Sequence, residues 1–181
     1  MKLFKKLAAA ALAAVLALSM VGCGAGGTGS ALDLKNEVLN AIEDSYYTSG
    51  KTATHKTAMD MAAAKLIEDA AEAGAAEDNE ETVKTLLKNQ TIEGESGYIA
   101  IVMPYGQLST ELMQQVYIEK MERTLDSAIE YIANEDYYND YDTIVKIGNP
   151  LIGEDDSIEI GAATGKIKGK NYLVLLVKKA A

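Results

Sequence analysis

The chain contains a single cysteine, Cys23, so everything that follows it must fold without an internal disulfide. For the same reason no thiolate site exists beyond this residue. The roughly 150 residues of the range 32–181 are enough for one domain that buries close to 70% of its unfolded surface. We therefore predict one domain over 32–181 that is stabilised by its hydrophobic core.

The residues before Cys23 have the layout of a secretory signal. Lys2, Lys5 and Lys6 form a basic start, and the uncharged stretch 7–21 follows. A helix that spans a bilayer needs roughly 20 apolar residues, and this stretch is shorter and ends in small residues, which disfavours a permanent transmembrane helix. We predict that residues 1–22 are a signal peptide.

The end of this signal, Leu18-Ser19-Met20-Val21-Gly22-Cys23, resembles the lipobox of bacterial lipoproteins, with Met20 where leucine is commoner. The resemblance implies that the signal is removed, that the Cys23 sulfur carries a diacylglyceryl group, and that the new amino terminus takes a further acyl chain such as palmitate. Two or more chains anchor a protein stably, whereas one binds a bilayer only marginally. We expect a domain anchored at Cys23 on the outer face of the membrane, with 23–31 as a flexible glycine-rich tether. The alternative is a plain secreted protein.

The mature chain is strongly acidic. Loss of the three leader lysines leaves 14 basic residues against 27 acidic ones, which changes the net charge from −10 to −13. Nucleic acid is then excluded as an expected partner, because phosphate binding needs a basic face. The acidic surface would also hold the domain away from an anionic leaflet, although solubility alone is the simpler explanation.

Helices and strands are predicted from the spacing of apolar residues. Apolar residues recur every three or four positions from Leu32 to about Ser49, from Ala58 to Ala73 on an alanine-rich face that allows close packing, from Glu80 to Lys88, and from a capping Ser109 to about Asn134. Strands are predicted at 98–103, closed by Pro104, at 143–147, at 157–161 as a half-exposed strand, and at 172–177, with 164–170 as a hairpin loop. The apolar strands need helices on both faces, so the predicted fold class is a single-domain α/β structure, an α-β-α sandwich with a small, mostly antiparallel sheet.

Two segments resemble the CAP superfamily, also called SCP-like. One is Val38-Leu39-Asn40-Ala41-Ile42, leading to Ser49-Gly50 and the alanine-rich Ala58–Ala64; the other is the tail Ile158–Ala163 followed by Gly169–Val174. The resemblance implies an α-β-α sandwich in an exported protein. CAP domains with an intact cavity place two histidines and two acidic residues around a divalent metal. This chain has one histidine, His55, and only Glu93 or Glu95 loosely matches an acidic position, so the resemblance implies a degenerate member without the metal site.

Other candidate chemistry in the sequence is weak. A lone imidazole is a poor metal site, and His55 is predicted to face solvent at the start of the second helix. The segment 161–166, Gly-Ala-Ala-Thr-Gly-Lys, is similar to a phosphate loop but is one residue short and precedes a strand, so we reject it. Many carboxylate pairs are possible among the 27 acidic residues, and the sequence marks none of them as buried.

An acidic, aromatic segment after the long helix is the best candidate ligand surface. Its residues could coordinate calcium or stack a sugar, although the spacing of a calcium loop is missing, and a solvated loop is the simpler interpretation. The residues are Asp136, Tyr137, Tyr138, Asp140, Tyr141 and Asp142.

The sequence thus predicts a membrane-anchored, extracytoplasmic lipoprotein whose domain binds an extracellular ligand or an envelope protein. No cofactor, metal or catalytic residue is predicted. Two alternatives stay open: an envelope hydrolase that uses carboxylates, and a structural envelope component.

Overall fold

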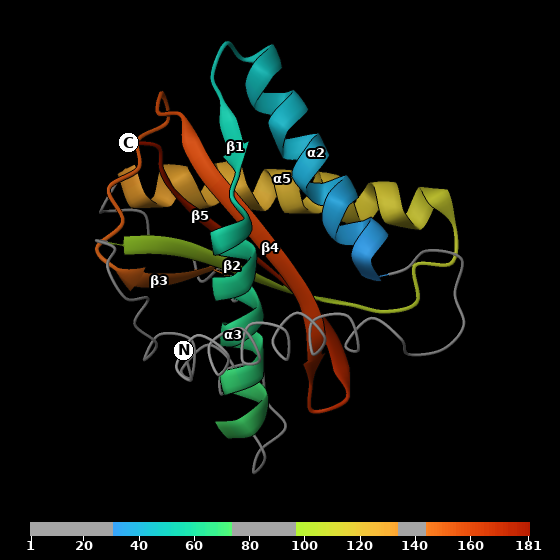
Figure 1. Ribbon diagram of the computed structural model, residues 1–181. Coiled ribbons are helices and arrows are strands. Elements are labelled where there is room, and N and C mark those ends of the chain that lie inside the picture. The colour runs from blue at the N-terminus through green and yellow to red at the C-terminus, as the bar shows by residue number, and fades with distance from the viewer. Residues whose placement is uncertain (1–30, 74–96, 134–143) are drawn as a thin grey trace, which may run out of the picture.

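The computed structural model describes residues 31–73, 97–133 and 144–181 (Figure 1). In chain order the elements are α2 (Ala31–Thr48), β1 (Ala53–His55), α3 (Thr57–Ala73), β2 (Gly97–Tyr105), α5 (Glu111–Ala133), β3 (Ile144–Gly148), β4 (Ile158–Ile167) and β5 (Lys170–Lys179). The three helices agree with predicted apolar repeats. β2 and β5 contain the strands predicted at 98–103 and 172–177, and β3 and β4 overlap those predicted at 143–147 and 157–161. No helix in the described part of the chain is long and apolar enough to cross a bilayer.

The five strands form one sheet in the order β1-β4-β5-β2-β3. All neighbouring pairs are antiparallel except β1 and β4, which run parallel with Ala53 opposite Ile158. The central strands β4 and β5 are joined by a tight turn at Lys168 and Gly169, both of which have positive φ. This connectivity makes the last two strands of the sequence the middle of the sheet.

Helices cover both faces of the sheet, as the apolar strands require. On one face, α2 and α5 bury Val38, Ile42 and Met121 against Ile99, Leu175 and their neighbours. On the opposite face, α3 buries residues such as Leu66 against Val174 and Leu176. The α-β-α sandwich predicted from the sequence is therefore confirmed.

Small residues on β4 let α3 lie directly on the sheet. A Cβ atom at Gly161 would stand 2.4 Å from Cβ of Met59 and 2.7 Å from the backbone nitrogen of Asp60. At Gly165 it would stand 2.6 Å from Cγ2 of Ile67. The close packing predicted for the alanine-rich helix is present, and the sheet contributes to it with glycines.

Several local predictions were wrong. β4 is a buried central strand that extends to Ile167, so the hairpin turn comprises two residues and not the predicted loop 164–170. The residue that caps the N-terminus of α5 is Thr110, and not the predicted Ser109. Thr110 Oγ1 accepts a hydrogen bond from the Met113 N–H at 3.2 Å. Pro104 does not end β2: it pairs with Tyr172 of β5, beyond Ile101, which pairs with the first residue of β3.

The short strand β1 was not predicted. Three residues are too few to show an apolar period, and the strand exists because β4 offers it a parallel partner. The signal peptide, the predicted helix 80–88 and the segment 135–142 lie outside the described residues. So does the predicted tether 23–31, except for Ala31, which is the first residue of α2.

Candidate functional site

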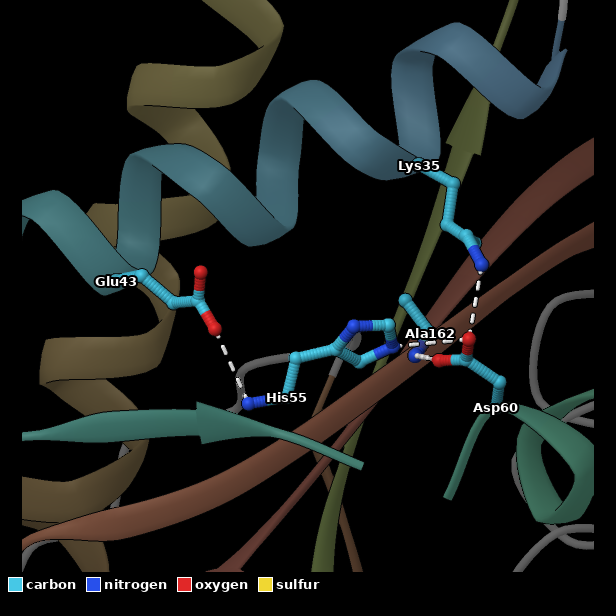
Figure 2. A network of polar contacts seen from close by, with 5 residues as sticks. All are labelled: Lys35, Glu43, His55, Asp60 and Ala162. Carbon is cyan, nitrogen blue, oxygen red and sulfur yellow. Dashed lines mark hydrogen bonds and ion pairs between the residues drawn. The ribbon is translucent and has the colours of Figure 1, made fainter. Parts of the chain in front are cut away.

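A cluster of polar residues is centred on Asp60, in the first turn of α3. A carboxylate is favoured there by the N-terminal end of the helix. The Asp60 side chain is only 16% exposed, and both of its oxygens accept hydrogen bonds. Oδ2 accepts from Lys35 Nζ at 2.8 Å and from His55 Nε2 at 2.9 Å, and Oδ1 accepts from the Ala162 N–H at 2.8 Å (Figure 2).

The residues joined by these hydrogen bonds come from every layer of the sandwich. Lys35 extends from α2 on one face of the sheet, Asp60 belongs to α3 on the other face, and Ala162 belongs to β4 between them. A fifth residue, Glu43 on α2, accepts a hydrogen bond from the His55 N–H through Oε1 at 3.1 Å. We call Lys35, Glu43, His55, Asp60 and Ala162 the Asp60 cluster.

The cluster closes one edge of the sheet. β1 ends at His55, opposite Ile160, and the Lys56 N–H still donates to the Ile160 carbonyl at 2.8 Å. Beyond this point, the next N–H of β4 on the side of β1 is that of Ala162, and it donates a hydrogen bond to Asp60. Glu43 likewise accepts a hydrogen bond from the His55 N–H. Left unpaired, such N–H groups on a sheet edge are a template for aggregation.

His55 differs from its predicted place. It ends a strand instead of starting a helix, and its side chain, 36% exposed, is held by Asp60. Because a carboxylate only accepts, the imidazole proton lies on Nε2 in this contact. The identity of Asp60 as the partner could have been suspected from its position five residues later, but the sequence does not show that the chain turns between them.

A carboxylate that orients an imidazole is a familiar arrangement in catalytic and metal sites. Here the same carboxylate also serves Lys35 and a backbone N–H, which makes it a joint between elements. Within 31–73, 97–133 and 144–181, no group of three or more His, Cys, Asp or Glu side chains is arranged to hold a metal ion. The geometry of the cluster is that of a structural joint.

A second feature, which the sequence did not single out, is a pair of carboxylates one turn apart on α5. Partial loss of hydration raises the pKa of Glu122, and the neighbouring Asp126 and Glu119 raise it further. The pKa of Asp126 is raised by the same loss of hydration, against the opposing effect of Lys51. The available signal was their position next to the core residues Met121 and Leu125; in the structure Glu122 is partly buried and Asp126 is exposed.

Tyr46 on α2 lies near this pair. Burial, with a smaller contribution from the charge of Asp126, raises the pKa of Tyr46 to about 12. Lys51 Nζ lies 5.0 Å from the centroid of the Tyr46 ring. Of the two α5 carboxylates, Asp126 therefore interacts with the Tyr46 phenol and with the Lys51 ammonium.

The remaining predicted site residues divide into two groups. Residues 161–166 lie within β4, where the glycines face α3, which agrees with the rejection of a phosphate loop. Cys23, Glu93, Glu95 and the candidate ligand surface Asp136, Tyr137, Tyr138, Asp140, Tyr141 and Asp142 lie outside the described residues.

Comparisons of the chain with models of protein families, with curated proteins and with solved structures find no significant match.

Proposed function

We propose that the protein is a bacterial lipoprotein, anchored through acylated Cys23 on the outer face of a membrane, whose domain binds a ligand or an envelope protein without catalysing a reaction. The observation that carries the proposal is the sequence of 1–23: a basic start, an uncharged stretch, and a small residue before the only cysteine. The α-β-α sandwich supports it, because a domain without disulfides needs a core of this extent.

The binding role is supported by the composition of the cluster that most resembles an active site. Asp60, the carboxylate that could orient His55, also accepts from two other donors and is thereby engaged in joining elements. The resemblance to CAP domains that lack the metal-binding histidines points the same way. The proposed ligand surface is the segment 136–142, with its three tyrosines and three aspartates.

The anchor is tested by expressing the full chain in a bacterial host. We expect the mature protein to partition into the detergent phase, and mass spectrometry to find residue 23 as an acylated amino terminus. Cys23→Ala should abolish both results, while Ser30→Ala in the tether should change neither. An unmodified Cys23, or an intact leader on cytosolic protein, would refute the anchor.

The binding role is tested with glycans, sterols and peptides as probes, read as a rise in the melting temperature of the wild-type protein. A probe that binds at 136–142 should lose its effect in the double variant Tyr137→Ala/Tyr141→Ala and keep it in Tyr47→Ala, which removes an 82% exposed tyrosine elsewhere. A probe that is unaffected by the double variant would place the ligand surface elsewhere. A tight stoichiometric zinc site would instead favour a CAP-type hydrolase.

A second candidate function, a hydrolase that uses paired carboxylates, is favoured by the raised pKa values of Glu122 and Asp126. Hydrolysis of cell-wall glycan by the wild-type protein, lost in Glu122→Gln and Asp126→Asn but retained in Glu37→Gln, would support it. Absence of hydrolysis by the wild-type protein on that substrate would count against it.

A further inference from the structure

The first two turns of α5 expose a group of large apolar side chains. Leu112 is 69% exposed, Met113 is 48% exposed and Val116 is 53% exposed. Leu112 and Met113 stand four and three positions before Val116, so both are its neighbours on one side of the helix. We call Leu112, Met113 and Val116 the α5 patch.

The core does not account for these residues. α5 packs on the sheet through Tyr117, Met121 and Leu125, each at most 7% exposed. The outer face that begins with Leu112 and Val116 continues, one and two turns later, with Glu119 and Arg123, which are exposed and charged. The same face is therefore apolar where α5 begins and polar where it continues.

The chain around the patch is also poor in charge. Glu111 is the single charged residue in the range 106–118, in a protein whose mature net charge is −13 after removal of the leader lysines. A negatively charged leaflet repels acidic surface and leaves an uncharged apolar patch free to approach. Of the surfaces around α5, this end meets the least repulsion at a membrane.

The position of the anchor selects the same end of the molecule. Seven residues, 24–30, separate Cys23 from the start of α2. The first residue of α2 therefore lies at most roughly 25 to 30 Å from the lipidated residue. α2 and α5 contact each other on one face of the sheet. Both helices begin on the right-hand side of Figure 1, so the α5 patch lies at the end of the domain where the tether attaches.

We propose that the α5 patch docks on the bilayer that carries the lipid anchor, with Leu112, Met113 and Val116 entering the interface between headgroups and acyl chains. This proposal rests on the proposed lipid anchoring at Cys23. The occupant of the patch is the lipid surface itself. Because the tether already holds the domain near the membrane, a small apolar contact is enough to populate the docked orientation.

The test uses the full-length lipoprotein reconstituted in vesicles of phosphatidylethanolamine and phosphatidylglycerol. Acylation blocks the thiol of Cys23, so Val116→Cys introduces a single site for an environment-sensitive fluorophore. We expect quenching by spin-labelled lipids at this position. Tyr47→Cys, near the opposite end of α2, is the matched control and should show no quenching.

A second variant separates docking from folding. Leu112→Glu/Met113→Glu, added to Val116→Cys, should reduce quenching roughly tenfold, because two exposed apolar side chains are replaced by charges. The melting temperature should be unchanged, since neither side chain is in the core.

The possible outcomes are distinct. Acylated Cys23 with an unquenched fluorophore at Val116 would overturn the docking proposal and leave the anchor intact. A fluorescence change that occurs without spin-labelled lipid and follows self-association of the protein would assign the patch to a second copy of the chain. That result would also overturn the docking proposal. An unmodified Cys23 would refute the proposed function, and the docking proposal with it.

Discussion

Asp60 accepts the backbone hydrogen bond from β4 that a further residue of β1 would otherwise accept. Its Oδ1 takes the N–H of Ala162 just beyond the end of the strand, while Oδ2 holds Lys35 and His55 from two other elements. Apart from His55, the partners lie at separations of 25 and 102 residues. A sequence pattern reports contacts within a helical turn or across a short hairpin, so it could not have revealed this cluster.

Replacement of Asp60 should destabilise the fold. We expect Asp60→Ala to lower the free energy of unfolding by about 2 to 3 kcal/mol, because the Ala162 N–H and the Lys35 ammonium lose their acceptor in a partly buried site. Asp60→Asn keeps one acceptor oxygen and should cost less. Urea unfolding measures both, with exposed Asp155→Ala as the control, expected within about 0.5 kcal/mol of wild type. Equal values for Asp60→Ala and Asp155→Ala would show that the cluster adds no stability.

At the scale of elements, the contact between α3 and β4 determines how closely the layers approach. The alanine-rich repeat at 58–73 correctly predicted a helix that packs closely. The sequence did not show which strand lies beneath it, because Gly161 and Gly165 resemble turn residues when neighbours are unknown. Their meaning comes from the backbone of Met59 and Asp60, about 100 residues earlier in the chain.

The two glycines should respond differently to alanine. Gly161→Ala places a methyl group against backbone atoms of Met59 and Asp60, which cannot move without shifting α3, so we expect a loss of about 3 kcal/mol or more. Gly165→Ala meets side-chain atoms of Ile67 and no backbone atom, so a small shift of one side chain relieves the contact and the cost should be smaller. Gly106→Ala has no atom within 4 Å of the added carbon and serves as the control. Thermal unfolding of the three variants gives the order, and a Gly165→Ala protein less stable than Gly161→Ala would contradict it.

At the scale of the whole molecule, the fold class followed from the sequence because apolar runs and apolar repeats alternate along the chain. Burial of the strands at 98–103 and 172–177 required helices on both faces, and the structure has them. Strand order and the parallel edge strand did not follow, since each depends on pairing between distant residues. The raised pKa values on α5 did not follow either, because burial is their main cause. The candidate ligand surface 136–142 and the anchor at Cys23 stay predictions.

Two carboxylates should make opposite contributions to stability as the pH changes. Hydrogen bonds from Lys178 and Lys56, at 3.0 and 3.3 Å, hold the pKa of Glu159 below its usual range, so its contribution is present above the unfolded pKa of about 4.3 and is lost as pH falls through the folded value. The pKa of Glu122 is raised, so its charged form is disfavoured by folding at neutral pH.

We therefore expect Glu159→Gln to lower the melting temperature at pH 7, and Glu122→Gln to raise it, each by about one to three degrees. Both differences should shrink as the pH falls, and that of Glu122→Gln should shrink first, because the raised pKa of Glu122 is crossed at a higher pH than the lowered pKa of Glu159. Melting curves from pH 3 to 8 measure this. A Glu159→Gln protein equally destabilised at pH 3 and pH 7 would indicate lost packing in place of lost charge.

The central strands of the sheet are the last to be synthesised. β5 is the last described element and ends at Lys179, and each of the two hydrophobic cores is built on residues from both β4 and β5. A ribosome that has released α2, β1 and α3 has therefore produced helices and an edge strand with no surface to pack on. The two cores therefore cannot close until β5 has left the ribosome, so folding of this domain waits for its last strand.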